Sequence, residues 1–148
     1  MKEKYAYSKH ACACAVSLDL LGDKWSLIIV RDLFRGKTTY SEFLKQSQER
    51  IASNILVDRL KKLKAIGIID FRRNERDKKI KEYFLTDRGI DLYPVIYALQ
   101  YWTLKHVDFD YSENTKNWNA LTKTISQKGV IDKYQDGYRA KRRKFFGF

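Results

Sequence analysis

Apolar residues recur at helical spacing in the first part of the chain, and three short helices are expected there. Residues 11–21 form a short apolar segment that a glycine ends. From Lys24 an apolar stripe runs along one helical face, and Gly36 supplies the left-handed conformation that ends such a helix. The segment Thr39-Tyr-Ser-Glu has the spacing of a capping box. A third helix should therefore begin near Tyr40, ahead of a polar turn.

The clearest helical pattern in the chain covers residues 53–66 and has one apolar and one polar face. The apolar face is formed by Ile55, Leu56, Leu60, Leu63 and Ile66. The polar face and its edges are formed by Ser53, Asn54, Val57, Asp58 and Lys61. This helix is expected to bury one side against the rest of the domain and to expose the other.

After this helix the periodicity changes from helical to extended. Two strand-like runs, residues 68–73 and 80–85, are rich in β-branched and aromatic side chains, and the polar residues 74–79 between them suit a hairpin tip. Thr86 is a good N-cap for a long helix, which Pro94 bends or restricts at its start. The apolar positions of that helix are Leu92, Val95, Ile96, Leu99 and Trp102. The order of elements predicts a mainly α fold with a small β-hairpin wing (α+β), the winged helix-turn-helix.

The charge of the chain narrows the choice of partner. Its 148 residues fit one domain with an extra element, and 30 basic against 18 acidic residues give a formal charge of +12. Such a surplus favours a polyanion, because each neutralised phosphate releases condensed counterions; an anionic membrane surface and a simply well-solvated surface are the alternatives. No apolar run approaches the roughly 18 residues of a membrane span, and the first residues lack the apolar core of a signal peptide. A cytoplasmic protein without a membrane partner is therefore expected.

Several segments match, in order and spacing, those of one family. They are Cys12, Leu18-Asp-Leu-Leu-Gly-Asp-Lys-Trp25, Ile28-Ile-Val-Arg-Asp-Leu-Phe-Arg-Gly36, Tyr40-Ser-Glu-Phe43, residues 51–56, Asp58-Arg-Leu-Lys-Lys-Leu-Lys-Ala-Ile-Gly-Ile68, Glu82-Tyr-Phe-Leu-Thr-Asp-Arg-Gly89 and Trp102. From Cys12 to Trp102 the chain resembles the HxlR-type winged helix-turn-helix regulators, relatives of the MarR proteins. The resemblance implies a dimeric DNA-binding regulator of transcription whose terminal helices make the dimer contacts. It also implies that the family's cysteine is Cys12, which senses oxidants or electrophiles in some members; in many others no such role is established.

The sequence departs from this family at a few places. Asp23 stands where a second glycine is usual, and Ala52 stands where a serine commonly caps the recognition helix. Residues beyond about Val107 run past the family's usual end. We therefore expect a winged helix-turn-helix DNA-binding domain with its dimerisation helix over residues 1–107, and a C-terminal extension over residues 108–148.

The extension divides into two parts. Residues 113–128 carry Trp118, Leu121 and Ile125 at helical spacing, which predicts an amphipathic helix against the dimer interface. The last ten residues, 139–148, form a basic and aromatic tail that can contact DNA or an anionic membrane surface. A frayed terminus or a segment that docks a partner explains the same residues.

The recognition-type helix carries the first candidates for DNA contact. Ser53 and Asn54 stand at its N-terminal end, where side chains reach base edges, and an Asn can form two hydrogen bonds with adenine. Val57 lies on the same exposed face. Arg59 and Lys61 are expected on phosphate, or Arg59 on an acidic neighbour in the core. An ordinary amphipathic helix with a solvated polar face is the alternative.

The predicted wing is strongly basic. Residues 72–81 carry six basic and two acidic side chains, which suits phosphate or minor-groove contact; a solvated hairpin tip without a ligand is the alternative. The expected DNA-binding residues of the wing are Arg72, Arg73, Arg76, Lys78 and Lys79. Tyr40 and Ser41, at the start of the supporting helix, can hydrogen-bond phosphate or serve simply as caps.

The two cysteines, Cys12 and Cys14, allow three interpretations. An exposed thiolate would sense oxidants or electrophiles, the small residues around the cysteines would pack against another helix, or His10 and both cysteines would bind a metal. The metal set lacks a fourth ligand and the usual zinc spacing. No metal site is therefore expected, and of the two remaining interpretations packing is favoured over sensing.

No catalytic motif stands out in the chain. Gly36-Lys-Thr38 resembles the end of a phosphate-binding loop, but Arg31 stands where that loop needs another glycine. His10 and His106 belong to no recognisable catalytic motif. Neither an enzyme nor a cofactor is expected.

Taken together, these patterns predict a sequence-specific transcriptional regulator that binds an inverted-repeat operator in double-stranded DNA as a homodimer. Two effectors are compatible with the sequence, an oxidant at Cys12 or a small molecule in a pocket near Tyr97, Tyr101 and Trp102, although packing is favoured both for the cysteines and for these aromatic residues. The alternative function is a redox-responsive protein-interaction module on a winged-helix scaffold, without operator binding.

Overall fold

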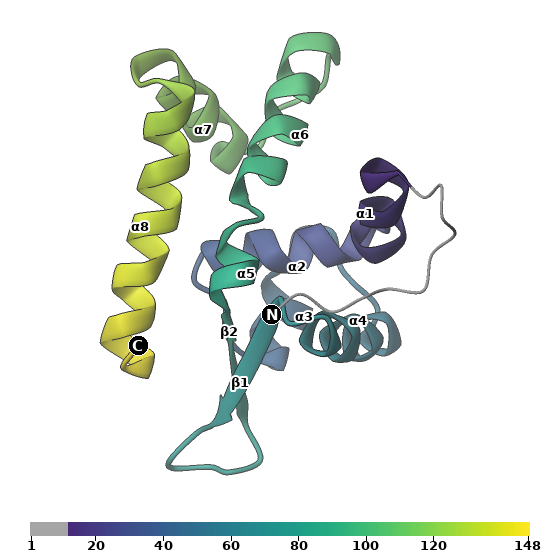
Figure 1. Cartoon of the computed structure of the whole chain (residues 1–148), viewed down its shortest axis with the longest axis vertical. Helices are drawn as coiled ribbons and strands as arrows, with labels where there is room; N and C mark the ends of the chain where they lie inside the picture. The colour runs from purple at the N-terminus through teal and green to yellow at the C-terminus, as the bar shows by residue number, and fades with distance from the viewer. Residues whose placement is uncertain (1–11) are drawn as a thin grey trace.

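A computed structural model describes residues 12–148 of the chain and shows a helical protein with one β-hairpin (Figure 1). Its elements are α1 (Ala13–Leu21), α2 (Lys24–Phe34), α3 (Tyr40–Gln46), α4 (Ser53–Ala65), β1 (Ile69–Arg73), β2 (Lys81–Leu85), α5 (Asp87–Ile90), α6 (Tyr93–His106), α7 (Glu113–Thr124) and α8 (Gln127–Phe146). The strands β1 and β2 pair antiparallel. The predicted mainly α fold with a small β-hairpin wing is confirmed.

Local capping fixes where the first helices begin. The Asp23 carboxylate accepts hydrogen bonds from the backbone N–H groups of Trp25 and Ser26 and so caps α2. The capping box predicted at the start of α3 is present, with reciprocal bonds between Thr39 and Glu42. Helix α4 begins after Ala52 without a side-chain cap, so its start depends on the turn that precedes it.

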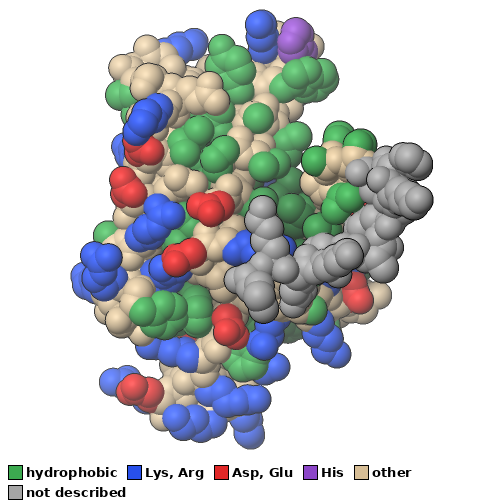
Figure 2. All heavy atoms as spheres, in the orientation of Figure 1, with side chains coloured by type: hydrophobic (Ala, Val, Ile, Leu, Met, Phe, Trp, Pro, Cys, Tyr) green, Lys and Arg blue, Asp and Glu red, His purple; other side chains and the backbone are tan. Residues whose placement is uncertain are grey.

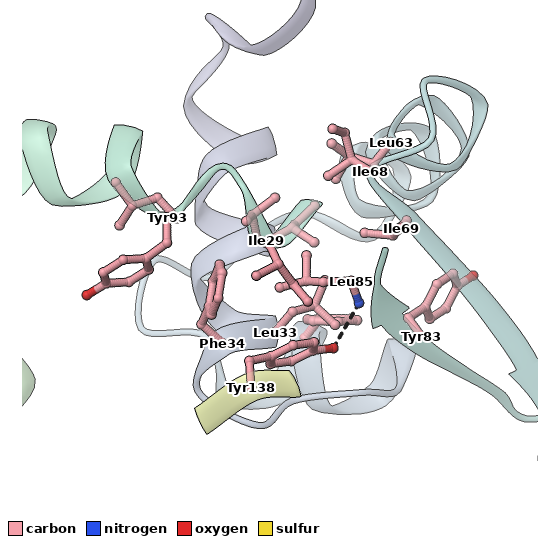
Figure 3. Close-up of a cluster of buried hydrophobic side chains, with 14 of the residues drawn as sticks. Ile29, Leu33, Phe34, Leu63, Ile68, Ile69, Tyr83, Leu85, Tyr93 and Tyr138 are labelled. Carbon is pink, nitrogen blue, oxygen red and sulfur yellow. Dashed lines mark hydrogen bonds between the residues drawn. The ribbon is translucent and has the colours of Figure 1, made fainter. Parts of the chain in front are cut away.

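The core lies where α2 and α4 meet the hairpin (Figure 3). Its most deeply buried side chains are Ile29, Val30, Leu33, Phe43, Leu56, Leu63, Ile69, Leu85 and Ile90. Of the five apolar positions predicted to share one face, Leu56, Leu60 and Leu63 are buried, and Ile55 and Ile66 are half-buried. Helix α4 therefore packs on the rest of the domain through the apolar face that its periodicity predicts.

The hairpin is joined to the helix-turn-helix by more than side-chain packing. The backbone N–H of Tyr83 donates to the Thr38 carbonyl oxygen at 2.7 Å, and Thr39 and Glu82 form an isolated antiparallel bridge. The segment before α3 thus pairs with the outer edge of β2. This pairing holds the supporting helix and the wing in one unit.

The chain after Thr86 corrects one prediction, because the expected long helix is two helices, α5 and α6. Thr86 caps α5 as predicted, but Pro94 lies in the first turn of α6, where its missing N–H costs nothing. A proline inside a continuous helix would leave the carbonyl oxygen of Ile90 without its partner. In this chain the side-chain amide of Gln135, from α8, donates to that oxygen at 3.0 Å.

Helices α7 and α8 belong to the same hydrophobic core as the winged helix. Trp118, Val130 and Tyr138 are buried in it, and the Trp118 indole N–H donates to the Tyr93 hydroxyl at 2.9 Å. The predicted amphipathic helix ends at Thr124, earlier than expected, because α8 begins as a new helix soon afterwards. Its Trp118 face packs on α6 of the same chain.

The last residues form the final turns of α8 and not a separate tail. The Leu85 backbone N–H donates to the Tyr138 hydroxyl at 2.8 Å, the interaction dashed in Figure 3. Arg142 donates to the Leu85 carbonyl oxygen at 2.9 Å and to Asp87 at 2.7 Å. The ring of Phe84 contacts those of Phe146 and Phe148. We call this set of contacts between α8 and the end of β2 the Leu85 clamp.

The Leu85 clamp generates a stability prediction. Replacing Tyr138 with Phe keeps the packed ring but leaves the buried Leu85 N–H without its acceptor, so the free energy of unfolding should fall by about 1–3 kcal/mol. Equilibrium denaturation in urea would measure the change.

Tyr111→Phe is the matched control, because within residues 12–148 the Tyr111 hydroxyl makes no hydrogen bond. Its unfolding free energy should equal that of the parent. Equal stability of both variants would show that the bond to Leu85 contributes nothing.

Candidate nucleic-acid interface

Helix α4 exposes to solvent the polar face that lies opposite its buried apolar face. Ser53, Asn54 and Lys61 are exposed, and Val57 keeps 41% of its surface accessible despite its apolar side chain. Ser53 and Asn54 are the first two residues of the helix. The recognition-helix candidates therefore share one accessible surface, with the two short polar side chains at its N-terminal end.

A groove of about 470 Å³ runs between α3, α4 and the hairpin. It is lined by Thr39, Tyr40, Ser41, Val57, Leu60, Lys61, Lys79, Ile80, Lys81 and Tyr83. Candidates that the sequence identified separately, on the supporting helix, the recognition helix and the wing, thus line one continuous concave surface. Thr39 and Glu42 already cap α3, so the hydroxyl groups of Tyr40 and Ser41 are not engaged as its caps.

Most cations of the wing have no acidic partner. Within residues 12–148, no carboxylate lies within 4.0 Å of the charged groups of Arg73, Arg76, Lys78, Lys79 and Lys81. Lys and Arg side chains gather over the hairpin in Figure 2. The Asn74 side chain accepts from the backbone N–H groups of Arg76 and Asp77 and shapes the tip. The wing therefore combines a defined turn with unpaired positive charge.

Arg72 differs from the other wing cations because its side chain is engaged within the chain. It pairs with Glu82 at 3.2 Å, and its guanidinium carbon lies 4.4 Å from the centre of the Phe146 ring of α8. Arg72 consequently joins the base of the wing to the C-terminal helix.

Arg59 also contacts acidic neighbours. It pairs with Asp23 at 2.7 Å and with the adjacent Asp58. Burial raises the pKa of Asp23, but hydrogen bonds from Ser26 and Arg59 outweigh it and hold that pKa well below its usual value. Of the two roles expected for Arg59, the structure contains the ion pair, which links α4 to the start of α2.

A second ion-pair network fixes the turn before α4, and the pattern of neighbouring residues does not predict it. Arg31 donates two hydrogen bonds to the Glu49 carboxylate and two more to Oδ1 of Asp32. The bonds from Arg31 outweigh burial and lower the pKa of Glu49 to about 2. Glu49 belongs to the polar turn between α3 and α4, 18 residues from Arg31. No local pattern could pair residues at that separation.

The two cysteines lie at the start of α1. Cys12 is the N-cap, and its Sγ accepts from the Ala15 backbone N–H at 3.4 Å. Both thiols are exposed. His10 of the weighed metal set lies outside the described residues, and residues 12–148 hold no group of three His, Cys, Asp or Glu side chains suited to a metal ion.

The helix-turn-helix of α3 and α4, with the adjoining basic hairpin, defines a winged helix-turn-helix protein. The model of the HxlR-like helix-turn-helix family matches residues 20–111, and this chain belongs to that family of transcriptional regulators. Family membership implies DNA binding. Among the described helices, none is long and apolar enough to cross a membrane.

Curated relatives carry the same general description. YdeP of Bacillus subtilis, an uncharacterized HTH-type transcriptional regulator, is 32% identical over 97 residues, which cover 66% of this chain and 75% of that protein. The regulator sll1512 of Synechocystis sp. is 32% identical over 90 residues, covering 61% of this chain and 66% of the relative. The match spans 53% of Rv3095 of Mycobacterium tuberculosis, at 31% identity over 58% of this chain.

Solved structures extend the likeness to three dimensions. PA1607, described as a transcription factor, is 37% identical with a TM-score of 0.62, over 71% of this chain and 72% of that one. The redox regulator HypR in its oxidized form is 28% identical with a TM-score of 0.58, over 66% of this chain and all of that one. The reduced form of the transcriptional regulator YodB of B. subtilis is 26% identical with a TM-score of 0.55, over 66% of this chain and 96% of that one. The matched family region ends before α7 and α8.

Proposed function

We propose that this regulator binds an inverted-repeat operator as a homodimer, with α4 in the major groove and the wing on the flanking backbone. The observation that carries the proposal is the groove that joins α3, α4 and the hairpin, with accessible polar side chains on α4 and unpaired cations on the wing. A helix of this kind fits the major groove of DNA, whose base edges it reads through side chains at its N-terminal end.

The proposal assigns different tasks to the residues around the groove. Asn54 is a candidate for two hydrogen bonds with adenine, and Val57 for apolar contact with a thymine methyl group. Lys61, Arg76 and Lys79 are candidates for phosphate contacts, which hold the protein on the duplex without reading its sequence. Arg59 and Arg72 would position α4 and the wing without contacting DNA themselves, because both are held by ion pairs within the chain.

A second copy of the chain is proposed to cover the apolar surface of α1 and α6. Leu18, Leu99 and Trp102 expose 61%, 53% and 60% of their surface, and a groove of about 560 Å³ separates these helices along α2. Figure 2 shows hydrophobic side chains gathered over α6. Exposed apolar surface of this extent marks an interaction site. A two-fold dimer would present two α4 helices to half-sites about 34–36 Å apart.

Selection of genomic DNA fragments by the purified protein, followed by salt titration on any enriched duplex, tests the proposal as a whole. An enriched inverted repeat, bound with an affinity that falls steeply with salt, is the expected result. Absence of enrichment, with only weak binding, would overturn operator binding and favour the alternative of a protein-interaction module on this scaffold.

Two sets of variants separate base reading from backbone contact. Asn54→Ala should lower the preference for the enriched sequence by about 1–3 kcal/mol and leave binding to random duplexes unchanged. Arg76→Gln with Lys79→Gln should weaken binding to every duplex and lower the salt slope by about 0.9 for each phosphate that is no longer neutralised. Fluorescence anisotropy with specific and random duplexes measures both effects.

Lys116→Gln with Lys123→Gln is the matched control, because it removes two exposed charges from α7, away from the groove. Its binding should equal that of the parent. If this control reduced affinity as much as the wing variant does, net charge and not the wing would account for the effect.

The dimer proposal predicts the effect of a buried charge. Leu99→Glu would place a carboxylate in the proposed interface and should weaken association by about thirty-fold or more, as removal of a central apolar side chain costs about 2 kcal/mol or more. Sedimentation velocity gives the oligomeric state. Ile125→Glu, at the exposed end of α7, should leave it unchanged; a parent chain that sediments as a monomer would refute the interface.

We also propose that oxidation of Cys12 controls operator binding. Its thiol is exposed at the start of α1, a helix of the proposed dimer surface, and two of the similar structures are those of a redox regulator and of a regulator solved in its reduced form. Hydrogen peroxide would convert this thiol to a sulfenic acid and release water. Operator affinity of the parent and of Cys14→Ser should then fall, while Cys12→Ser should not respond. An equal response of both variants would assign the effect elsewhere.

A further inference from the structure

The C-terminal end of α8 lies directly beside the wing. The Leu85 clamp fixes it to β2, and Arg72 of β1 stacks on Phe146. Figure 1 shows α8 running from α7 back towards the hairpin, so that the C-terminus lies near the hairpin and far from α7. The end of α8 is thus held against the DNA-binding half of the molecule.

This end of α8 carries positive charge that the chain itself does not neutralise. Residues 139–144 include five cations and no acidic residue. Arg139 and Arg142 pair with aspartates of the same chain. For Lys141, Arg143 and Lys144, no carboxylate lies within 4.0 Å among residues 12–148. Arg143 and Lys144 lie in the last turn of α8, where they complement the helix dipole. The dipole explains neither the additional cation Lys141 nor the position of this end of α8 beside the wing.

Lys141 connects this charge to the wing. It lines a hollow of about 300 Å³ together with Thr38, Arg72 and Glu82, which belong to the segment before α3 and to the base of the hairpin. Lys144 follows three residues later, close to the same helical face. Lys141 therefore lies beside the base of the wing, and Lys144 stands about one helical turn further along α8.

We propose that Lys141 and Lys144 form a second phosphate-binding surface that contacts duplex DNA outside each half-site, beyond the wing. The inference rests on the proposed operator binding and extends it, because residues past 111 lie outside the family match. The wing reaches the backbone beside the half-site, and the end of α8 lies next to the base of the wing. DNA longer than the inverted repeat can then supply phosphates to these two side chains.

The arrangement of apolar groups favours DNA over an anionic membrane. A helix that lies on a membrane needs a free apolar face, but Tyr138 is buried against β2 and Phe146 packs on Phe84. Only Phe145, at 61% exposure, and the end residue Phe148 remain accessible near the two lysines. Two exposed rings do not make a continuous apolar face, and a surface on which cations predominate suits a phosphate backbone.

Two duplexes test the inference, both carrying the enriched inverted repeat from the genomic selection. One ends at the outer base pairs of the repeat, and the other has about ten further base pairs, one helical turn, on each side. For the parent, the longer duplex should bind more tightly and with a steeper salt slope. In Lys141→Gln with Lys144→Gln, affinity for the longer duplex should fall by about tenfold or more, and the salt slope by up to about 3.6, since a dimer carries four of these lysines at about 0.9 each. The shorter duplex should bind as it does to the parent.

Matched variants separate this effect from net charge and from stability. Lys116→Gln with Lys123→Gln removes the same charge from α7 and should bind both duplexes like the parent. Lys141→Arg with Lys144→Arg keeps the charge and should retain the preference for the longer duplex. Thermal unfolding of all variants should match the parent, because both lysines are exposed and neither belongs to the Leu85 clamp.

Each other result would overturn the inference. If the glutamine variant bound both duplexes like the parent, α8 would make no DNA contact, and operator binding would stand. An equal decrease on both duplexes would place the lysines within the half-site. Weaker binding to phosphatidylserine vesicles, with no effect of the flanking base pairs, would assign the surface to a membrane. If the parent bound no duplex specifically, the proposed function would fail and the inference with it.

Discussion

The unpaired edge of β2 is the constraint on which the arrangement depends. A two-stranded hairpin leaves one edge of each strand without backbone partners, and buried N–H and carbonyl groups must find them elsewhere. One end of β2 pairs with the segment before α3 through Tyr83 and Thr38. At the other end, Tyr138 and Arg142 of α8 take both backbone groups of Leu85. The supporting helix, the wing and the C-terminal extension are joined because they satisfy the same strand.

Charged side chains, which total +12, also differ in whether they have a partner within the chain. Carboxylates near the helix-turn-helix are engaged in contacts that shape it: Asp23 caps α2 and pairs with Arg59, Glu42 closes the capping box, and Glu49 holds Arg31. The buried Asp32 pairs with Arg31 and Lys37, as a buried charge requires. Described cations without a carboxylate within 4.0 Å occur on several elements, but they follow one another most closely along the wing and at the end of α8. The total charge of the chain does not reveal this local clustering.

Local signals in the sequence predicted much of this fold. The capping box at Thr39, the apolar face of α4 and the change of period at the hairpin each depend on a few neighbouring residues, and the structure contains all of them. Pro94 indicated that the helix after Thr86 is bent or restricted at its start, but the division into α5 and α6 also involves a contact that local sequence does not predict, since the Ile90 carbonyl oxygen finds its donor in Gln135, 45 residues away. The same holds for the site. Exposure of Asn54 follows from helical period, but the engagement of Arg72 by Phe146 depends on where α8 docks.

The Leu85 clamp also sets an order of events during synthesis. Its contacts join residues 53 and 57 positions apart, and the chain grows at about 5–20 residues per second. The 63 residues that follow Leu85 thus take about 3–13 s to make. During that interval the hairpin can pair with the segment before α3, but the end of β2 has no partner from α8. The nascent protein therefore passes through a stage in which its helix-turn-helix is complete and its wing is braced on one side only.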